Sequence, residues 1–256
     1  MRTVLVTGTS TGIGRACAEH LGARGWRVLA GVRRAEDAPA GCEPVVLELA
    51  DVRWQERPLD AAVLNAGVAL SGPLEFVPVD ELRQQFEVNV VGQVALLQRV
   101  LPALRASRGR IVLIGSVSGR LALPFLGPYA ASKFALEAVT DALRGEVAPF
   151  GIPVSLVQPG SIATPMWRKG AERAARLPPP AVELYGTRIA ALRAWAERRG
   201  AVTPPEEVAR VVEHALTARV PRTRYVVGRG ARTRTLIGRA PDPLRDRLIR
   251  RLLRSK

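Results

Sequence analysis

Short apolar segments alternate with longer segments of helical periodicity along the whole chain. The short segments are rich in valine, leucine and isoleucine and have the length of buried strands. They are Thr3–Thr7, Trp26–Gly31, Pro44–Leu49, Ala61–Asn65, Arg110–Gly115, Pro153–Gln158 and Tyr225–Val227. Helical patterns fall at Gly12–Arg24, Val79–Arg105, Gly127–Phe150, Pro180–Arg199 and Pro204–Ala218. This alternation predicts an α/β fold, a doubly wound parallel sheet with helices on both faces and ligands at the carboxyl ends of its strands.

Composition indicates one domain with an aliphatic core. The 256 residues contain no linker or internal repeat, and 47% hydrophobic residues with only 5% aromatics predict packing by alanine, valine and leucine. No apolar run approaches the roughly 20 residues that span a bilayer, and the first strand pattern begins at Thr3, so we expect no signal peptide. Cys17 and Cys42 have neither metal-binding nor disulfide spacing. We therefore expect a cytoplasmic protein without a metal site.

The net charge of +15 raises nucleic acid as a partner. However, the arginines are spread from Arg2 to Arg254, and no zinc-finger or RNA-binding motif accompanies them. We expect no specific nucleic-acid binding. Leucines and Ile249 form one face of the segment Pro243–Leu253, with arginines on the other. Such a helix can lie on a membrane or bind a partner, but its short apolar stripe favours packing on the domain.

A glycine-rich turn follows the first strand and opens the first helix, with the sequence Thr7-Gly8-Thr9-Ser10-Thr11-Gly12-Ile13-Gly14. Glycines allow a tight turn and close approach of the backbone to a pyrophosphate, and a helix N-terminus attracts phosphate. The spacing is a G-x-x-x-G-x-G variant of the usual dinucleotide fingerprint. The candidate cofactor-binding residues here are Gly8, Ser10, Thr11, Gly12, Ile13 and Gly14.

The end of the second strand indicates which dinucleotide binds. It reads Ala30-Gly31-Val32-Arg33-Arg34, with no carboxylate to hold the ribose 2′-hydroxyl of NAD. Arg33, with Arg34 and Thr11 nearby, could instead pair with a 2′-phosphate through charged hydrogen bonds. Because arginine is common in this chain, the missing acid is the stronger observation. We therefore predict NADP(H) in preference to NAD(H).

Lys133 stands four residues after Tyr129 and is one of only three lysines in an arginine-rich chain. On a helix, residues four apart share one face. The ammonium could therefore favour the phenolate of Tyr129 and lower its pKa from about 10, making it a candidate general acid/base. The alternative for the isolated pair is a surface Tyr/Lys contact. The remaining motifs favour catalysis.

Together the motifs resemble the short-chain dehydrogenase/reductase family over nearly the whole chain. The motifs are Thr7–Gly14, Asn65-Ala66-Gly67, Asn89, Ser116, Tyr129 with Lys133, and Pro159-Gly160. The segments Pro124–Tyr129 and Gly160–Trp167 look most like the retinol and 17β-hydroxysteroid dehydrogenase branch. The resemblance implies a single Rossmann domain with seven parallel strands in the order 3-2-1-4-5-6-7. Its cofactor half would cover about 1–115 and its catalytic half about 116–256.

The resemblance also implies a role for each matching residue. Tyr129 would be the general acid/base, Lys133 would lower its pKa and bind the nicotinamide ribose, and Ser116, rather than its rival Ser118, would polarise the substrate carbonyl. Asn89 would complete a proton relay through water to Lys133. Ile162 and Thr164 would fix the carboxamide. The other cofactor-binding candidates are Glu48 and Leu49 near adenine (with Asp51 as an alternative to Glu48), Asn65, Ala66, Gly67, Pro159 and Gly160.

Two segments depart from or extend the family pattern. The short stretch between Asp51 and Asp60 leaves little room for a crossover helix, so we expect an abbreviated loop there. Residues 166–202 should form a mobile apolar lid, which suggests a hydrophobic ketone or secondary alcohol as substrate. Alternatives are an NAD-linked alcohol dehydrogenase and a non-enzymatic binding or regulatory protein of the same fold. The resemblance further implies a homodimer or homotetramer, paired through Val79–Arg105 and Gly127–Phe150.

Overall fold

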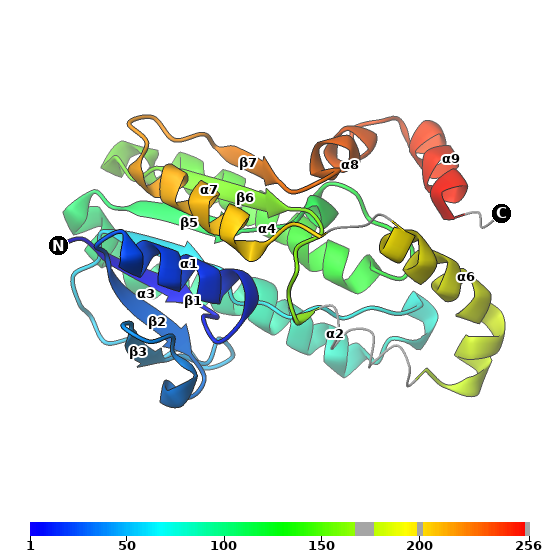
Figure 1. Cartoon of the computed structure of the whole chain (residues 1–256), viewed down its shortest axis with the longest axis horizontal. Coiled ribbons are helices and arrows are strands. Elements are labelled where there is room, and N and C mark those ends of the chain that lie inside the picture. The colour runs from blue at the N-terminus through cyan, green and yellow to red at the C-terminus, as the bar shows by residue number, and fades with distance from the viewer. Residues whose placement is uncertain (167–176, 199–201, 254–256) are drawn as a thin grey trace.

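Seven parallel strands form one sheet, in the order β3-β2-β1-β4-β5-β6-β7 (Figure 1). The computed structural model describes residues 1–166, 177–198 and 202–253. The strands are β1 (Thr3–Thr7), β2 (Arg27–Val32), β3 (Glu43–Val46), β4 (Ala61–Leu64), β5 (Arg110–Ile114), β6 (Val154–Pro159) and β7 (Arg224–Val227). From β1 the chain first extends the sheet to one side, through β2 and β3, and then to the other side, from β4 to β7. The predicted doubly wound sheet and its strand order are therefore confirmed.

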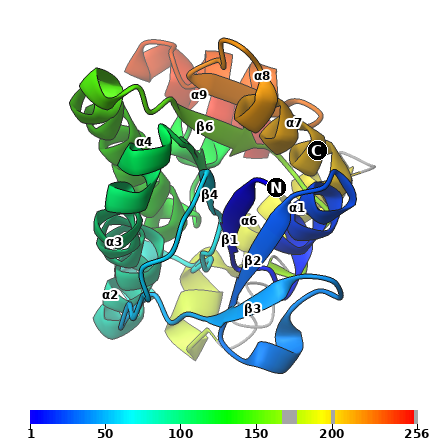
Figure 2. The same ribbon diagram turned by 90° about the vertical axis from the view of Figure 1, so that its left-hand side faces the viewer.

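Helices cover both faces of this sheet. They are α1 (Gly12–Ala23), α2 (Val79–Phe86), α3 (Gly92–Ser107), α4 (Gly127–Val147), α6 (Pro179–Arg198), α7 (Pro205–Thr217), α8 (Ala231–Ile237) and α9 (Asp242–Leu253). Seen along the sheet, α2, α3 and α4 lie on one side and α1 and α7 on the other (Figure 2).

A hydrophobic core lies on each face of the sheet, and the alternation of side chains along β1 shows how one strand contributes to both. Val4 and Val6 pack with residues of α1 and α7, whereas Leu5 between them packs with residues of α3 and α4. Successive side chains of a strand point to opposite faces, and both faces of a parallel sheet are buried. The strand runs consequently read as continuous apolar segments in the sequence.

Three elements differ from the sequence prediction. β3 ends at Val46 rather than at Leu49, because the chain turns there through a bridge between Glu48 and Asp51. The predicted helix Val79–Arg105 contains the π-helical segment η3 (Glu87–Val91) between α2 and α3. Helix α8 was not predicted, because it is only seven residues long and rich in arginine and threonine. The stretch 52–59 has no helix, as predicted.

The C-terminal helix α9 packs on the domain through part of its apolar face. Ile249 is buried with Leu121 and Leu123, whereas Leu244 remains 48% exposed. The packing prediction is thus confirmed for Ile249 but not for the whole stripe. Among the described residues, no helix has both the length and the apolar character needed to cross a bilayer.

Candidate active site

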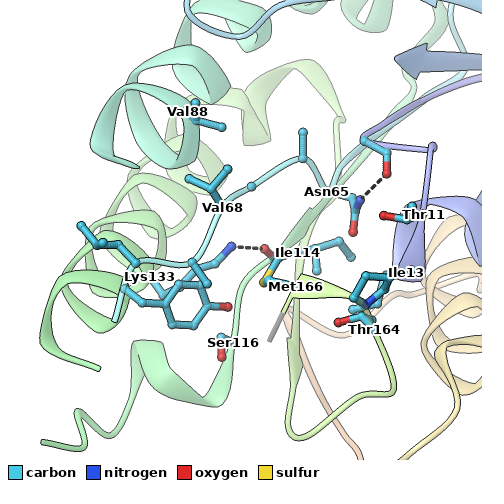
Figure 3. A pocket seen from close by; sticks show the side chains of 18 of the residues that line it. Thr11, Ile13, Asn65, Val68, Val88, Ile114, Ser116, Lys133, Thr164 and Met166 are labelled. Atoms are coloured by element: carbon cyan, nitrogen blue, oxygen red, sulfur yellow. Dashed lines mark hydrogen bonds between the residues drawn. The ribbon is translucent and has the colours of Figure 1, made fainter. Parts of the chain in front are cut away.

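A cavity of about 800 Å³ opens at the carboxyl ends of the central strands (Figure 3). Thr11, Ile13 and Asn65 lie on one side of it, and Ser116 and Lys133 on the other. Most of the predicted site residues line it, namely Gly8, Ser10, Thr11, Gly12, Ile13, Arg33, Glu48, Leu49, Asn65, Ala66, Gly67, Ser116, Tyr129, Lys133, Pro159, Gly160, Ile162 and Thr164. Gly14, Arg34 and Asn89 are not in the lining. The fold therefore brings residues from both halves of the chain to one hollow.

The glycine-rich turn Thr7–Gly14, called the glycine loop below, has a backbone geometry that suits a bound anion. Gly8 adopts φ +68°, and a Cβ there would lie 2.9 Å from the Ala66 Cα. At Gly14, a Cβ would overlap the Gly8 carbonyl, so this glycine serves close contact between α1 and the loop rather than lining the cavity. Thr11 provides no side-chain cap to α1, and the first turn contains no acid. The unpaired N–H groups and the positive end of the helix dipole remain available to a phosphate.

Asn65 ties the end of β4 to β1. Its Nδ2 donates to the carbonyl of Thr7 (2.9 Å) and to that of Gly8 (3.3 Å), and its backbone N–H donates to the Thr7 hydroxyl (2.9 Å). This asparagine lines the cavity and also holds the glycine loop in place. These bonds give Asn65 a structural role beside the glycine loop, and its part in binding a cofactor stays a prediction.

The two arginines after β2 have different surroundings. Arg33 is exposed and lines the cavity. Arg34 points its guanidinium at Asp37, with both bonds at 3.1 Å. Only Arg33 is therefore placed to meet a ligand of the cavity, and the inclusion of Arg34 in the predicted set finds no support in the geometry. Glu48 lines the same end, as predicted.

The residues predicted to be catalytic are buried. Tyr129 is 5%, Lys133 4% and Ser116 6% exposed. Lys133 Nζ donates to the carbonyl of Ile114 over 2.9 Å and lies 5.9 Å from the centroid of the Tyr129 ring. The surface-pair interpretation is therefore wrong, because both side chains of the pair line an internal cavity.

The predicted lowering of the Tyr129 pKa is corrected by this geometry. Burial raises the pKa of Tyr129 to about 12, although a hydrogen bond with Ser116 opposes the change. Burial likewise lowers the pKa of Lys133 to about 8. Desolvation disfavours the charged form of each group, and the ammonium is directed at Ile114. Without a bound ligand, the Tyr129 phenol is thus protonated at neutral pH and is a proton donor rather than a base.

Ser116 is favoured over Ser118 by position and contact. Ser116 lines the cavity and accepts a hydrogen bond from the backbone N–H of Ser118 (3.0 Å), which starts the 3₁₀ turn η4 (Val117–Gly119). This hydroxyl also contacts Tyr129. Ser118 is not in the lining. The hydroxyl that the sequence singled out is therefore the one beside the phenol.

Asn89 is 1% exposed and bonds to the loop after β4. Its Oδ1 accepts from the N–H of Val68 (2.8 Å), and its Nδ2 donates to the Val68 carbonyl (2.9 Å) and to Ser132 Oγ (3.0 Å). The side chain therefore faces the protein interior rather than solvent, and it holds a cavity wall in place. A role in a water relay stays a prediction.

Two further amides hold the same wall and were missed in the sequence. Gln93 donates to the carbonyl of Ala66 and Gln85 accepts from the N–H of Leu70, both over 2.5 Å. Gln85, Asn89 and Gln93 are spaced by four and bond to residues 66, 68 and 70 of the cavity wall. The spacing of three amides on one helical face was a visible signal for this arrangement.

One part of the cavity lining is formed mainly by apolar side chains, with Ser71 and Glu81 as polar residues among them. The apolar side chains include those of Leu70, Phe76, Val77, Met166 and Leu177. Of the predicted lid, residues 167–176 lie outside the described residues, as does the side chain of Trp195. In α6, Ile189 is buried, whereas Val182 and Leu184 are more than half exposed. Met166, Leu177 and Pro178 are thus the described lid residues that meet the cavity.

Comparison with known proteins agrees with this geometry. The sequence profile described as "short chain dehydrogenase" matches residues 2–44 and 42–175. The chain belongs to the short-chain dehydrogenase family. It is 38% identical over 252 residues to the NADPH-dependent 3-dehydrocapnine reductase of Ornithobacterium rhinotracheale, covering 89% of this chain and 88% of that protein. It is also 38% identical over 255 residues to human retinol dehydrogenase 5, covering 88% of this chain and 80% of that protein.

Solved structures show the same fold. A short-chain dehydrogenase from Burkholderia cenocepacia in complex with NADP superposes with a TM-score of 0.75 at 26% identity, covering all of both chains. One from Streptomyces avermitilis gives a TM-score of 0.76 at 29% identity, covering 97% of this chain and 96% of that one. Family membership makes the protein an oxidoreductase with a Rossmann fold.

Proposed function

We propose that this oxidoreductase transfers a hydride between NADP(H) and a hydrophobic ketone or secondary alcohol. The observation that carries the proposal is that one cavity joins an uncapped helix N-terminus to the buried Tyr129, Lys133 and Ser116. Its glycine-loop end suits a pyrophosphate, and the lining around Leu70, Phe76 and Leu177 is apolar apart from Ser71 and Glu81. When bound, the nicotinamide supplies or takes up the hydride.

Arg33 supports NADP(H) as the cofactor. Its guanidinium lines the cavity at the end of β2, where a 2′-phosphate would accept charged hydrogen bonds. Two similar proteins bear names that agree: one is an NADPH-dependent reductase and another was solved with NADP. NAD(H) would leave this arginine without an anionic partner from the ligand.

Tyr129 and Ser116 would handle the proton and the substrate oxygen. With its pKa raised to about 12 by burial, the Tyr129 phenol stays protonated at neutral pH and can donate to a carbonyl oxygen that gains negative charge. Ser116, already in contact with the phenol, would hold the same oxygen. Lys133 would stabilise the tyrosinate left after the transfer by its positive charge.

The substrate class follows from this apolar part of the lining. Leu70, Phe76 and Leu177 offer no charge to a ligand, so a lipophilic carbonyl would bind by surface burial. The test is a panel of hydrophobic ketones with NADPH, and of the matching alcohols with NADP, monitored by nicotinamide absorbance. Reduction of several ketones by the wild-type protein, and at least a hundredfold slower reduction by Ser116→Ala, is the expected result. If charged ketones of equal size are reduced faster than lipophilic ones, the proposed substrate class is wrong.

A further inference from the structure

Lys133 and Glu137 have opposite charge, stand one turn apart on α4 and are both buried. Their side chains are 4% and 6% exposed. Lysine and glutamate four residues apart on a helix are neighbours that commonly pair, and in a buried setting the attraction is strong. These two residues nevertheless form no ion pair, although both lie in the described part of the chain. Lys133 donates to the Ile114 carbonyl instead.

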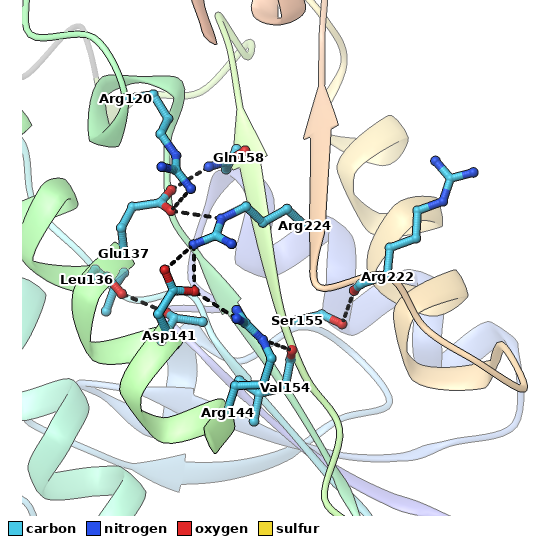
Figure 4. A network of polar contacts seen from close by, with 11 residues as sticks. Arg120, Leu136, Glu137, Asp141, Arg144, Val154, Ser155, Gln158, Arg222 and Arg224 are labelled. Carbon is cyan, nitrogen blue, oxygen red and sulfur yellow. Dashed lines mark hydrogen bonds and ion pairs between the residues drawn. The ribbon is translucent and has the colours of Figure 1, made fainter. Parts of the chain in front are cut away.

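The Glu137 carboxylate is held by three side chains from other elements (Figure 4). Arg120, directly after η4, contacts it over 2.8 Å, and Arg224 at the start of β7 contacts it over 3.1 Å. Gln158 of β6 donates to the other carboxylate oxygen. Two cations and an amide therefore satisfy a buried anion that would otherwise seek the nearest ammonium.

The turn η4 packs closely on α4 beside Glu137. A Cβ at Gly119 would lie 2.8 Å from the backbone carbonyl oxygen of Lys133 and 3.1 Å from the Cγ of Glu137. Only a glycine allows η4 to approach the helix this closely. The turn that begins at Ser116 thus ends in the arginine that binds Glu137.

We propose that Arg120, Arg224 and Gln158 are positioning residues that hold the Glu137 carboxylate away from Lys133, so that the ammonium stays free for Tyr129 and the cofactor. The inference rests on the proposed function. A Lys133–Glu137 ion pair would neutralise the charge that is to stabilise the tyrosinate. It would also draw the ammonium along α4, away from Tyr129.

Few charged side chains surround the network formed by Glu137 and its partners Arg120, Arg224 and Gln158. Facing Glu137 are Arg120 and Arg224 from the neighbouring elements. Asp141 and Arg144 follow on α4 itself, where Asp141 binds Arg224 over 2.6 Å and Arg144 over 2.8 Å. Lys133 is the cation nearest to Glu137 along the helix. Because Asp141 binds Arg224, it belongs to this network; Asp242 of α9, 79% exposed in its side chain and paired with Arg245 over 3.0 Å, makes the control.

Only three lysines occur in the chain, which allows Lys133 to be titrated directly. Lysine labelled with ¹³C at Cε gives three signals, and Lys133→Arg assigns the one of interest. The Lys133 pKa is measured without substrate in four forms of the whole protein. Two are the wild type and the double variant Arg120→Gln/Arg224→Gln, and the other two are these same proteins with Glu137→Gln added. Circular dichroism confirms that each variant is folded, and single Arg120→Gln replaces the double variant if that one is not.

The expected result is non-additive. With both arginines in place, Glu137→Gln should change the Lys133 pKa by less than about half a unit, because the carboxylate is occupied elsewhere. Without them, the carboxylate should pair with Lys133 and raise its pKa by on the order of one unit, and Glu137→Gln should reverse that rise. The double variant should also lose at least tenfold in kcat, with a smaller change in KM, whereas Asp242→Asn should alter neither the Lys133 pKa nor kcat.

Equal effects of Glu137→Gln in both backgrounds would overturn the inference, because they would mean that the arginines do not control where the carboxylate points. The titration does not depend on turnover. If the non-additive shift is observed and the wild-type protein reduces no ketone, the positioning inference stands and the proposed function fails.

Discussion

Lys133 donates its ammonium to the backbone carbonyl of Ile114 over 2.9 Å, at the carboxyl end of β5. Within the part of the chain that the structure describes, no carboxylate forms an ion pair with this buried ammonium. Burial lowers the pKa of this lysine to about 8. The protein therefore maintains an ammonium at a cost to its own stability, which the proposed function would account for.

Replacing this lysine should stabilise the fold while abolishing turnover. A shift from 10.5 to about 8 corresponds to about 3 kcal/mol of unfavourable burial. Lys133→Met removes it but leaves the Ile114 carbonyl without its donor, so we expect a net gain of about 1–2 kcal/mol in the free energy of unfolding at pH 7. Urea unfolding, monitored by circular dichroism, measures the difference.

The pH dependence of that gain has a defined sign. Because the folded-state pKa is lowered, the unfolded chain binds more protons between about pH 8 and 10.5, and wild-type stability rises with pH through this window relative to the variant. The advantage of Lys133→Met should be constant below about pH 8, fall by about 1.4 kcal/mol per pH unit above it, vanish between about pH 9 and 9.5, and reverse at higher pH. An advantage that grows with pH would mean that the ammonium is stabilised rather than desolvated.

Removing Arg33 should weaken NADP(H) selectively. Loss of a charged hydrogen bond to a 2′-phosphate corresponds to about ten- to a hundredfold in Kd, so Arg33→Ala should bind NADPH that much more weakly and NADH with unchanged affinity. Arg34→Ala is the matched control, since Arg34 is paired with Asp37. Quenching of the intrinsic fluorescence gives both constants. An equal loss for the two cofactors would remove the argument for a 2′-phosphate site.

Asn89 should be required for the structure of the cavity wall. Asn89→Ala leaves the partly buried N–H and C=O of Val68 without their partner, so we expect a loss of about 1–3 kcal/mol in the free energy of unfolding. Gln98→Ala, on the exposed face of α3, should change it by less than about 0.5 kcal/mol. Thermal unfolding gives the melting temperatures of the two variants for comparison. Similar melting temperatures would show that the wall does not depend on this amide.

The sheet and most of the cavity lining could be predicted because they depend on local sequence. Apolar runs define the strands, and glycines such as Gly8 mark a conformation that other residues rarely adopt. The π-helical turn at Glu87–Val91 could not be predicted, since it depends on bonds between Asn89 and a distant loop. The pKa of Tyr129 was predicted in the wrong direction because helical spacing sets which side chains are neighbours but not how deeply they are buried.

The role of Tyr129 is the centre of this account, and one comparison tests it directly. Wild-type protein and Tyr129→Phe are mixed with NADPH and a ketone that the wild type reduces, and nicotinamide absorbance is recorded alongside the Kd for NADPH. We expect Tyr129→Phe to bind NADPH with unchanged affinity and to reduce the ketone at least about a thousandfold more slowly. Turnover by Tyr129→Phe at a rate close to that of the wild type would contradict this expectation.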